Sequence, residues 1–148
     1  MRVLLEYAAT ISSALFAGAA LYVSVVEHPA RLQAGVAIAA AEFPPSYHRG
    51  ARLQAPLAVV GFVAALLAWF VGGGALWLVG SVLMFVPVPF TLLVIAPVTR
   101  QLLQLGTSVR PEIATPLLER WGHLHLVRTI LGISALGLFV FLLQSGHG

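Results

Sequence analysis

The chain has 148 residues, of which 59% are hydrophobic and 9% charged, with a formal net charge of +3 and a mean hydropathy of +0.97. Soluble domains carry about 25% charged residues, so this composition excludes a free soluble enzyme, a nucleic-acid-binding protein and a disordered tail. The basic residues are all Arg, the acidic residues are all Glu, and cysteine is absent, which excludes disulfides, thiolate chemistry and Cys-bound metals. An integral membrane protein remains.

Four stretches are long and apolar enough to cross a bilayer, whose hydrocarbon core needs about 20 residues of helix. They cover residues 4–26, 53–71, 75–96 and 124–143. The sequence therefore predicts an all-α integral membrane protein, with residues 1–148 forming a single domain that is a four-helix transmembrane bundle. The first stretch is too long for the apolar core of a signal peptide and is interpreted as an uncleaved helix.

The connections between the four spans differ in length. Gly72–Gly74 permits a tight reversal between the second and third spans. Aromatic residues beside this turn match an interfacial belt: Trp69, Phe70 and Trp77. The two longer loops, residues 28–52 and 98–120, hold six of the eight arginines and share one side of the membrane. This arginine excess predicts that the long loops are cytoplasmic and that both termini lie outside.

Two prolines interrupt the third span, at Pro87 and Pro89. Each removes a backbone donor, which predicts a kink or local unwinding. Such a kink is either purely structural or widens one end of the bundle into a pocket.

Ionisable groups cluster at the end of the first span. Ser24, Glu27 and His28 share one helix face, and Pro29 is expected to stop the helix. A carboxylate beside an imidazole orients the ring and raises its basicity, so Glu27 and His28 are candidate catalytic residues. The alternative is that both side chains reach the membrane interface without chemistry.

A second polar group opens the fourth span. Trp121, His125 and Arg128 are spaced by four and three residues, which places them on one helix face. Arg128 lies about a turn inside the membrane, so it must face the bundle interior and find a partner. Glu27 is the predicted partner, and a purely structural ion pair is the alternative.

A third group precedes the second span on the same side. Tyr47, His48 and Arg49 bring a phenol, an imidazole and a guanidinium together, and we expect them to form a lid over the polar residues. Histidines are also suitable metal ligands, and any metal site is expected to use His28, His48 and His125. The chain has no H-E-x-x-H motif and no paired Glu-x-x-His motif.

Several segments spread over nearly the whole chain form a combined pattern: Leu15–Tyr22, Val26–Arg31, Pro45–Gly50, Gln54–Leu57, Pro89–Thr91, Ile95–Val98 and Glu119–Thr129. The combination resembles small bacterial membrane proteins related to anthrone oxygenases. The resemblance implies a four-helix bundle in the bacterial inner membrane. Fungal members of that family are associated with oxidation of anthrones to anthraquinones. Pro87 and Thr99 depart from the family pattern, which has polar residues such as Asn in these regions.

The resemblance also implies a reaction, in which molecular oxygen is the co-substrate. A base removes a proton from the acidified CH₂ of a flat hydrophobic substrate, and a cation stabilises the resulting oxyanion. His28 is the preferred base, with Glu27 orienting it. The full prediction assigns His28, Glu27, His125 and Arg128 to catalysis, and Trp121, Tyr47, His48, Arg49, Arg31 and Tyr22 to substrate binding.

Two other functions stay open at this point. One is a metal- or haem-binding membrane redox protein that uses the same histidines. The other is a non-catalytic membrane subunit or small-molecule carrier. The expected partners are the lipid bilayer and a small hydrophobic substrate; a homo-oligomer is left open, and nucleic acid is not expected.

Overall fold

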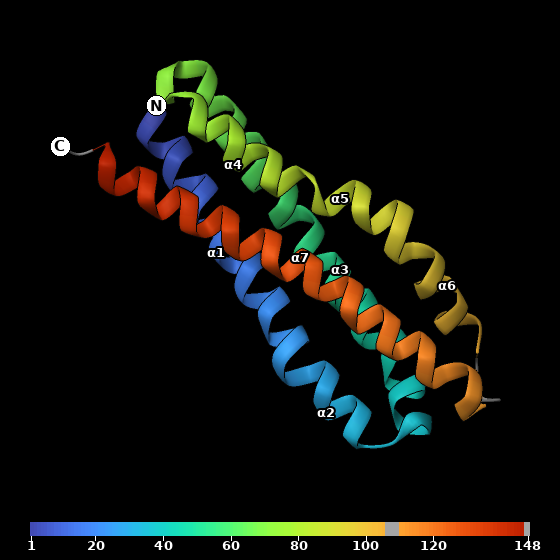
Figure 1. Ribbon diagram of the computed structural model, residues 1–148. Coiled ribbons are helices and arrows are strands. Elements are labelled where there is room, and N and C mark those ends of the chain that lie inside the picture. The colour runs from blue at the N-terminus through green and yellow to red at the C-terminus, as the bar shows by residue number, and fades with distance from the viewer. Residues whose placement is uncertain (106–109, 147–148) are drawn as a thin grey trace.

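The computed structural model describes residues 1–105 and 110–146, and every regular element within these ranges is a helix (Figure 1). Four helical segments in this part of the chain are long and apolar enough to cross a membrane. They are Arg2–Gln33, Val36–Gly73, Ala75–Gln104 and Pro111–Ser145, here called the first to fourth spans. The predicted all-α, four-helix transmembrane bundle is confirmed.

Three of the four spans consist of more than one helical element. The first span contains α1 (Arg2–Tyr22), the π-helical turn η1 (Val23–Glu27) and α2 (His28–Gln33). The second contains α3 (Val36–Ala68) and η2 (Trp69–Gly73). The third contains α4 (Ala75–Phe85), α5 (Pro87–Phe90), η3 (Thr91–Ile95) and α6 (Ala96–Gln104). The fourth is α7 (Pro111–Ser145).

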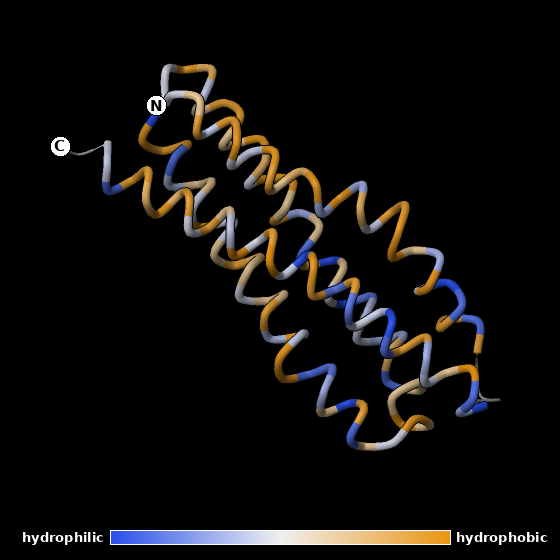
Figure 2. Tube along the Cα trace, in the orientation of Figure 1, coloured by the Kyte–Doolittle hydropathy of each residue, from blue (hydrophilic) through white to orange (hydrophobic). Residues whose placement is uncertain are grey.

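The helices extend well beyond the apolar stretches from which they were predicted. α3 has 33 residues and α7 has 35, so each is about 50 Å long, whereas the bilayer core is about 30 Å thick. Hydrophilic residues gather at one end of the bundle, where α2, α6 and the start of α7 lie (Figure 2). Most of the two predicted long loops is therefore helical, because hydropathy detects only the apolar part of a helix.

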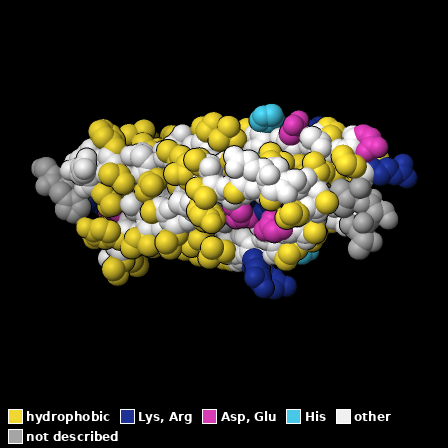
Figure 3. All heavy atoms as spheres, turned by 90° about the horizontal axis from the view of Figure 1, so that it is seen from below, with side chains coloured by type: hydrophobic (Ala, Val, Ile, Leu, Met, Phe, Trp, Pro, Cys, Tyr) yellow, Lys and Arg dark blue, Asp and Glu magenta, His cyan; other side chains and the backbone are white. Residues whose placement is uncertain are grey.

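The start of α1 and the end of α7 lie at the same end of the bundle as the turn between α3 and α4 (Figure 1). This turn uses Gly72 and Gly74, which both have positive φ, a conformation that glycine adopts without steric cost. The two longer connections lie at the opposite end, as predicted. The face in Figure 3 is largely covered by hydrophobic side chains, and most of its charged and histidine side chains lie in one half.

Pro29 does not stop the helix where the sequence predicted a stop, and the helix also continues past Pro97. A proline ring clashes with the carbonyl four residues earlier and cannot bond to it. For Pro29 that carbonyl belongs to Val25, and for Pro97 it belongs to Leu93; both lie inside π-helical turns, η1 and η3. A π turn is wider than an α turn, so the chain passes each proline and continues as a helix.

The third span bends at α5, as Pro87 predicts (Figure 1). Helical hydrogen bonding continues on both sides of the bend, from Val86 N to Val82 O (2.9 Å) and from Phe90 N to Val86 O (3.1 Å). The bend is therefore a kink without unwinding.

The end of the bundle near the termini has a closely packed core. Trp77 on α4 is only 2% exposed, and its ring stacks on Phe139 of α7 with centroids 5.1 Å apart. Gly80 lies one turn further along α4, and any side chain there would overlap the Phe139 ring. The prediction that Trp77 belongs to an interfacial belt is wrong, because it lies on the face of α4 that packs against α7.

Candidate active site

A cavity lies in the polar half of the bundle, between η1, α2, α3, α5, η3 and α7. It encloses about 740 Å³ free of protein atoms, including its open mouth, of which about 130 Å³ admits the centre of a water molecule. Its polar lining residues are Arg31, Ser46, Tyr47, Gln54, Thr91, His125 and Arg128.

The kink in the third span forms one wall of this cavity. Pro87, Val88, Thr91 and Leu92 all line it, so the structure favours the pocket over the purely structural interpretation of the prolines. Leu92 is 64% exposed, and Ala55 on the facing helix α3 is also exposed while lining the cavity. The cavity therefore opens sideways between α3 and η3, onto an apolar surface of the kind that faces lipid.

His125 is held in the cavity wall through its Nδ1 atom. Nδ1 lies 3.0 Å from Ser24 Oγ, which lies 2.8 Å from Thr129 Oγ1. Thr129 Oγ1 lies 3.1 Å from the backbone oxygen of Ala20. The three contacts form a chain from α7 to the first span, and His125 and Thr129 are both almost fully buried.

The number of available protons assigns the tautomer of His125. Thr129 Oγ1 also lies 3.3 Å from the backbone oxygen of His125, and neither this carbonyl nor that of Ala20 can donate, so the proton in these contacts belongs to Thr129. The proton between the two hydroxyls then belongs to Ser24, which leaves Nδ1–H of His125 as the donor to Ser24. In a neutral imidazole, Nε2 is then unprotonated and acts as a base. Among the described residues Nε2 has no hydrogen-bond partner, and it is not one of the enclosed atoms.

Arg128 lines the same cavity, one turn beyond His125. Its Nη2 donates to Gln54 Oε1 at 3.1 Å, and its guanidinium carbon lies 5.5 Å from the centre of the Phe16 ring. The predicted partner Glu27 is wrong, because that carboxylate binds Arg31.

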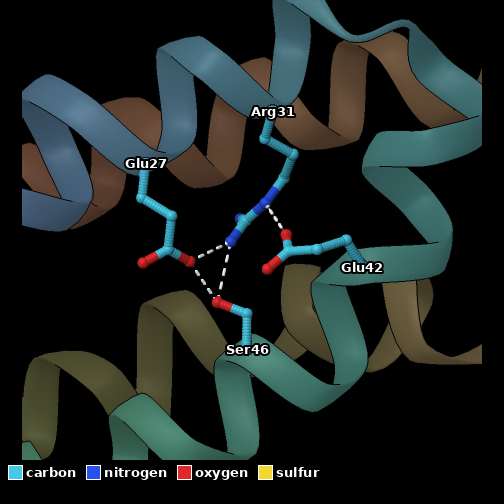
Figure 4. A network of polar contacts seen from close by, with 4 residues as sticks. All are labelled: Glu27, Arg31, Glu42 and Ser46. Carbon is cyan, nitrogen blue, oxygen red and sulfur yellow. Dashed lines mark hydrogen bonds and ion pairs between the residues drawn. The ribbon is translucent and has the colours of Figure 1, made fainter.

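Arg31 joins the first span to α3 through a compact network (Figure 4). Its Nε donates to Glu42, and its Nη2 donates to Glu27 and, at 2.8 Å, to Ser46 Oγ. The Ser46 hydroxyl donates to the same Glu27 oxygen. The Arg31 side chain is only 3% exposed, and its guanidinium carbon lies 5.5 Å from the Phe43 ring centre. Glu27 is thus occupied and does not orient His28.

Aromatic rings form the remaining wall. Trp121 stacks on His125, with centroids 4.9 Å apart and an interplanar angle of 24°, and meets the edge of Phe43 at 5.1 Å. Tyr47 stacks on the other side of Phe43 at 5.8 Å. The indole Nε1 donates to Thr99 Oγ1 at 3.2 Å, which fixes the ring. A flat aromatic ligand has matching surfaces here.

The sequence profile of the anthrone oxygenase family matches residues 43–138, well over half of the chain. The chain belongs to the anthrone oxygenase family. The matched range contains the α3, η3 and α7 residues of the cavity and ends before the C-terminal end of α7. Neither the curated proteins nor the solved structures contain a match to the chain.

His28 lies before the range matched by the anthrone oxygenase profile, and it is not among the residues that line the cavity. Its buried ring packs 5.4 Å from Trp121, against Gly122, where an added Cβ would lie 2.5 Å from Nε2. Both ring nitrogens are enclosed without a hydrogen-bond partner. His28 instead lines a second, more open hollow together with Ser24 and His123, in which about 400 Å³ admits the centre of a water molecule. The role of His28 as base stays a prediction, with His125 better placed.

The other predicted residues of this anthrone oxygenase family member divide into two groups. Tyr47, Trp121 and Arg31 line the cavity. Tyr22, His48 and Arg49 are exposed and are not among its lining residues. Over residues 1–105 and 110–146, no three His, Cys, Asp or Glu side chains come close enough together to hold a metal ion. His28, His48 and His125 are thus not gathered around one point.

Several polar cavity residues were not predicted from the sequence. Gln54 is buried and binds Arg128, and Ser46 and Thr129 complete the two networks. Each is an uncharged polar residue within or beside an apolar span. A search of the apolar spans for every side chain that can form hydrogen bonds would have identified these residues, because such a side chain needs a partner inside the membrane. Restricting the search to ionisable groups misses them.

Proposed function

We propose that this protein is a membrane-embedded oxygenase that oxidises a flat, hydrophobic carbon acid of the anthrone type with molecular oxygen. The observation that carries the proposal is that His125, held through Nδ1 by Ser24, and Arg128 line one aromatic-walled cavity. Membership of the anthrone oxygenase family supports the same reaction class.

The first step is proton transfer. The CH₂ group between the outer rings of an anthrone is acidic because its anion is conjugated with the ring carbonyl. His125 Nε2 takes one of its protons as a general base. The negative charge moves to the carbonyl oxygen, where Arg128 stabilises it.

The second step is oxygen transfer. The electron-rich carbon forms a bond with O₂, and the peroxide anion takes up a proton to give a hydroperoxide. Loss of water from the hydroperoxide breaks the O–O bond and the second C–H bond and leaves a carbonyl. One anthrone and one O₂ thus become one anthraquinone and one water. O₂ is the only oxidant that this balance requires.

The apolar mouth between α3 and η3 supports a substrate that arrives from the bilayer. Ala55 and Leu92 frame the opening with hydrocarbon. A three-ring aromatic compound partitions into lipid, because burying apolar surface is favourable. The membrane then supplies the substrate directly to the cavity.

Oxygen consumption with anthrone tests the proposal, using purified protein in detergent and a protein-free sample to subtract spontaneous oxidation. His125→Asn keeps an N–H donor near Ser24 but removes the base, and we expect a loss of about 10²–10⁴-fold. His28→Asn tests the other predicted base, and we expect most of the activity to remain if His125 is the base. An unchanged rate in His125→Asn would refute the assignment.

Elemental analysis and an optical spectrum of the same preparation show whether it contains a metal or haem. Their absence from an active preparation would argue against the redox alternative. Stoichiometric iron or haem would replace the proposal by a metal- or haem-dependent reaction. Anthrone binding without oxygen consumption in any preparation would favour the carrier function instead.

A further inference from the structure

None of the five carboxylates of this protein pairs with Arg128. Glu6 pairs with Arg2 at 3.2 Å, and the carboxylates of Glu27 and Glu42 both bind Arg31. The remaining two acidic residues, Glu112 and Glu119, are exposed. No described residue therefore supplies Arg128 with a negative charge, although this side chain lines a cavity within a membrane span.

The donors of Arg128 are only partly used. Nη2 binds the uncharged Gln54, and Nε is enclosed without a partner. Nη1 has no partner among the described residues and is not one of the enclosed atoms, so it keeps free surface on a side chain that lines the cavity. A cation in a membrane requires a counter-ion or hydrogen-bond acceptors. Nη1 is available for a ligand that supplies them.

A second charged group at the cavity, the network of Arg31, carries the opposite net charge. The Arg31 network combines one guanidinium with two carboxylates, which leaves one negative charge in excess. All three hydrogen-bonded contacts of that guanidinium lie within the network. Although Nη1 of Arg31 is also enclosed without a partner, the formal charges favour an anion at Arg128 over the Arg31 network. The rings of Phe43, Tyr47 and Trp121 also line the cavity.

We propose that the cavity binds a flat aromatic ligand as a monoanion, with its oxyanion against Arg128 and its uncharged rings against the aromatic wall. The ligand class is therefore phenols and enols of fused aromatic ketones, not neutral hydrocarbons. The kind of ring system in this inference rests on the proposed function. The anionic charge of the ligand rests only on the charges around the cavity. It makes Arg128 a ground-state ligand for the oxyanion and not only a stabiliser of a developing charge.

The probe is 2-hydroxyanthraquinone, a three-ring phenol whose colour changes when it ionises. We expect the dye bound to wild-type protein to ionise at a pH at least one unit lower than in protein-free micelles, a tenfold change in its ionisation constant. Excess neutral anthraquinone, which competes for the same cavity, abolishes the shift. An unshifted dye, or a shift that anthraquinone does not displace, overturns the proposal.

Two variants separate the charge of Arg128 from its packing. In Arg128→Met the shift is lost, whereas in Arg128→Lys, which keeps a cation, part of it remains. Arg120→Met on the same helix is the control, since Arg120 is exposed and outside the cavity, and it keeps the full shift. A shift that persists in Arg128→Met overturns the proposal; if that variant does not fold, the wild-type comparison with empty micelles still decides.

The anthrone assay distinguishes this inference from the proposed function. A shifted dye in a protein that consumes no oxygen supports the anion site and rejects the oxygenase. Oxygen consumption with an unshifted dye rejects the anion site and supports the oxygenase.

Discussion

Replacing Ser24 by Ala tests the tautomer of His125 directly. The hydroxyl of Ser24 accepts from Nδ1 across 3.0 Å and donates to Thr129. Without this hydroxyl, the hydrogen bond that stabilises the Nδ1–H tautomer of His125 is lost. A net hydrogen bond is worth about 0.5–1.5 kcal/mol, so the ratio of Nδ1–H to Nε2–H forms falls by about 2- to 13-fold. Turnover falls by no more than the same factor.

The measurement is ¹⁵N NMR of histidine-labelled protein in micelles, in which protonated and unprotonated ring nitrogens have well-separated shifts. The His125 signals are assigned by their loss in His125→Asn. Ser81→Ala is the matched control: Ser81 is also buried, but it donates to Leu78 O of its own helix at 2.8 Å and does not touch His125. A wild-type protein with the proton on Nε2, or an unchanged ratio in Ser24→Ala, contradicts the proton count.

The remaining predictions concern stability, measured by unfolding in mixed micelles. Gly132→Ala puts a Cβ 2.8 Å from the Phe16 ring and should cost about 1–3 kcal/mol, whereas Gly137→Ala, with nothing within 4 Å, should be neutral or stabilising; equal effects would mean that this packing is not the cause. Glu27→Gln should cost about 1.5–3 kcal/mol, because this carboxylate is 25% exposed and accepts two hydrogen bonds. Glu42→Gln, at 44% exposure, should cost about 0–1 kcal/mol; the reverse order would show that burial does not set the strength of these pairs.

The transmembrane architecture could be predicted because apolar length and helix periodicity are local properties of the sequence. The spacing of Trp121, His125 and Arg128 also placed these three side chains correctly along one wall, since a helix face follows from 3.6 residues per turn. The sides of the membrane on which the loops and termini lie, and the single-domain organisation, stay predictions.

The prediction that Glu27 pairs with Arg128 was wrong for an identifiable reason. Glu27 and Arg31 are four residues apart, which is a favourable ion-pair spacing on a helix. The sequence argument did not consider this pair, because Pro29 between them was expected to end the helix. The π turn η1 lets the helix continue, and the pair forms. A proline between two residues therefore does not exclude an ion pair between them.

The chain of contacts behind His125 ends at the backbone oxygen of Ala20. An amide oxygen is too weakly basic to hold a proton, so Ser24 and Thr129 cannot conduct one away from the imidazole. A proton taken up at Nε2 has to leave again by Nε2, into the cavity. In the reaction proposed above, the proton removed from the substrate would thus stay beside the reacting oxygen, where the formation of water requires it.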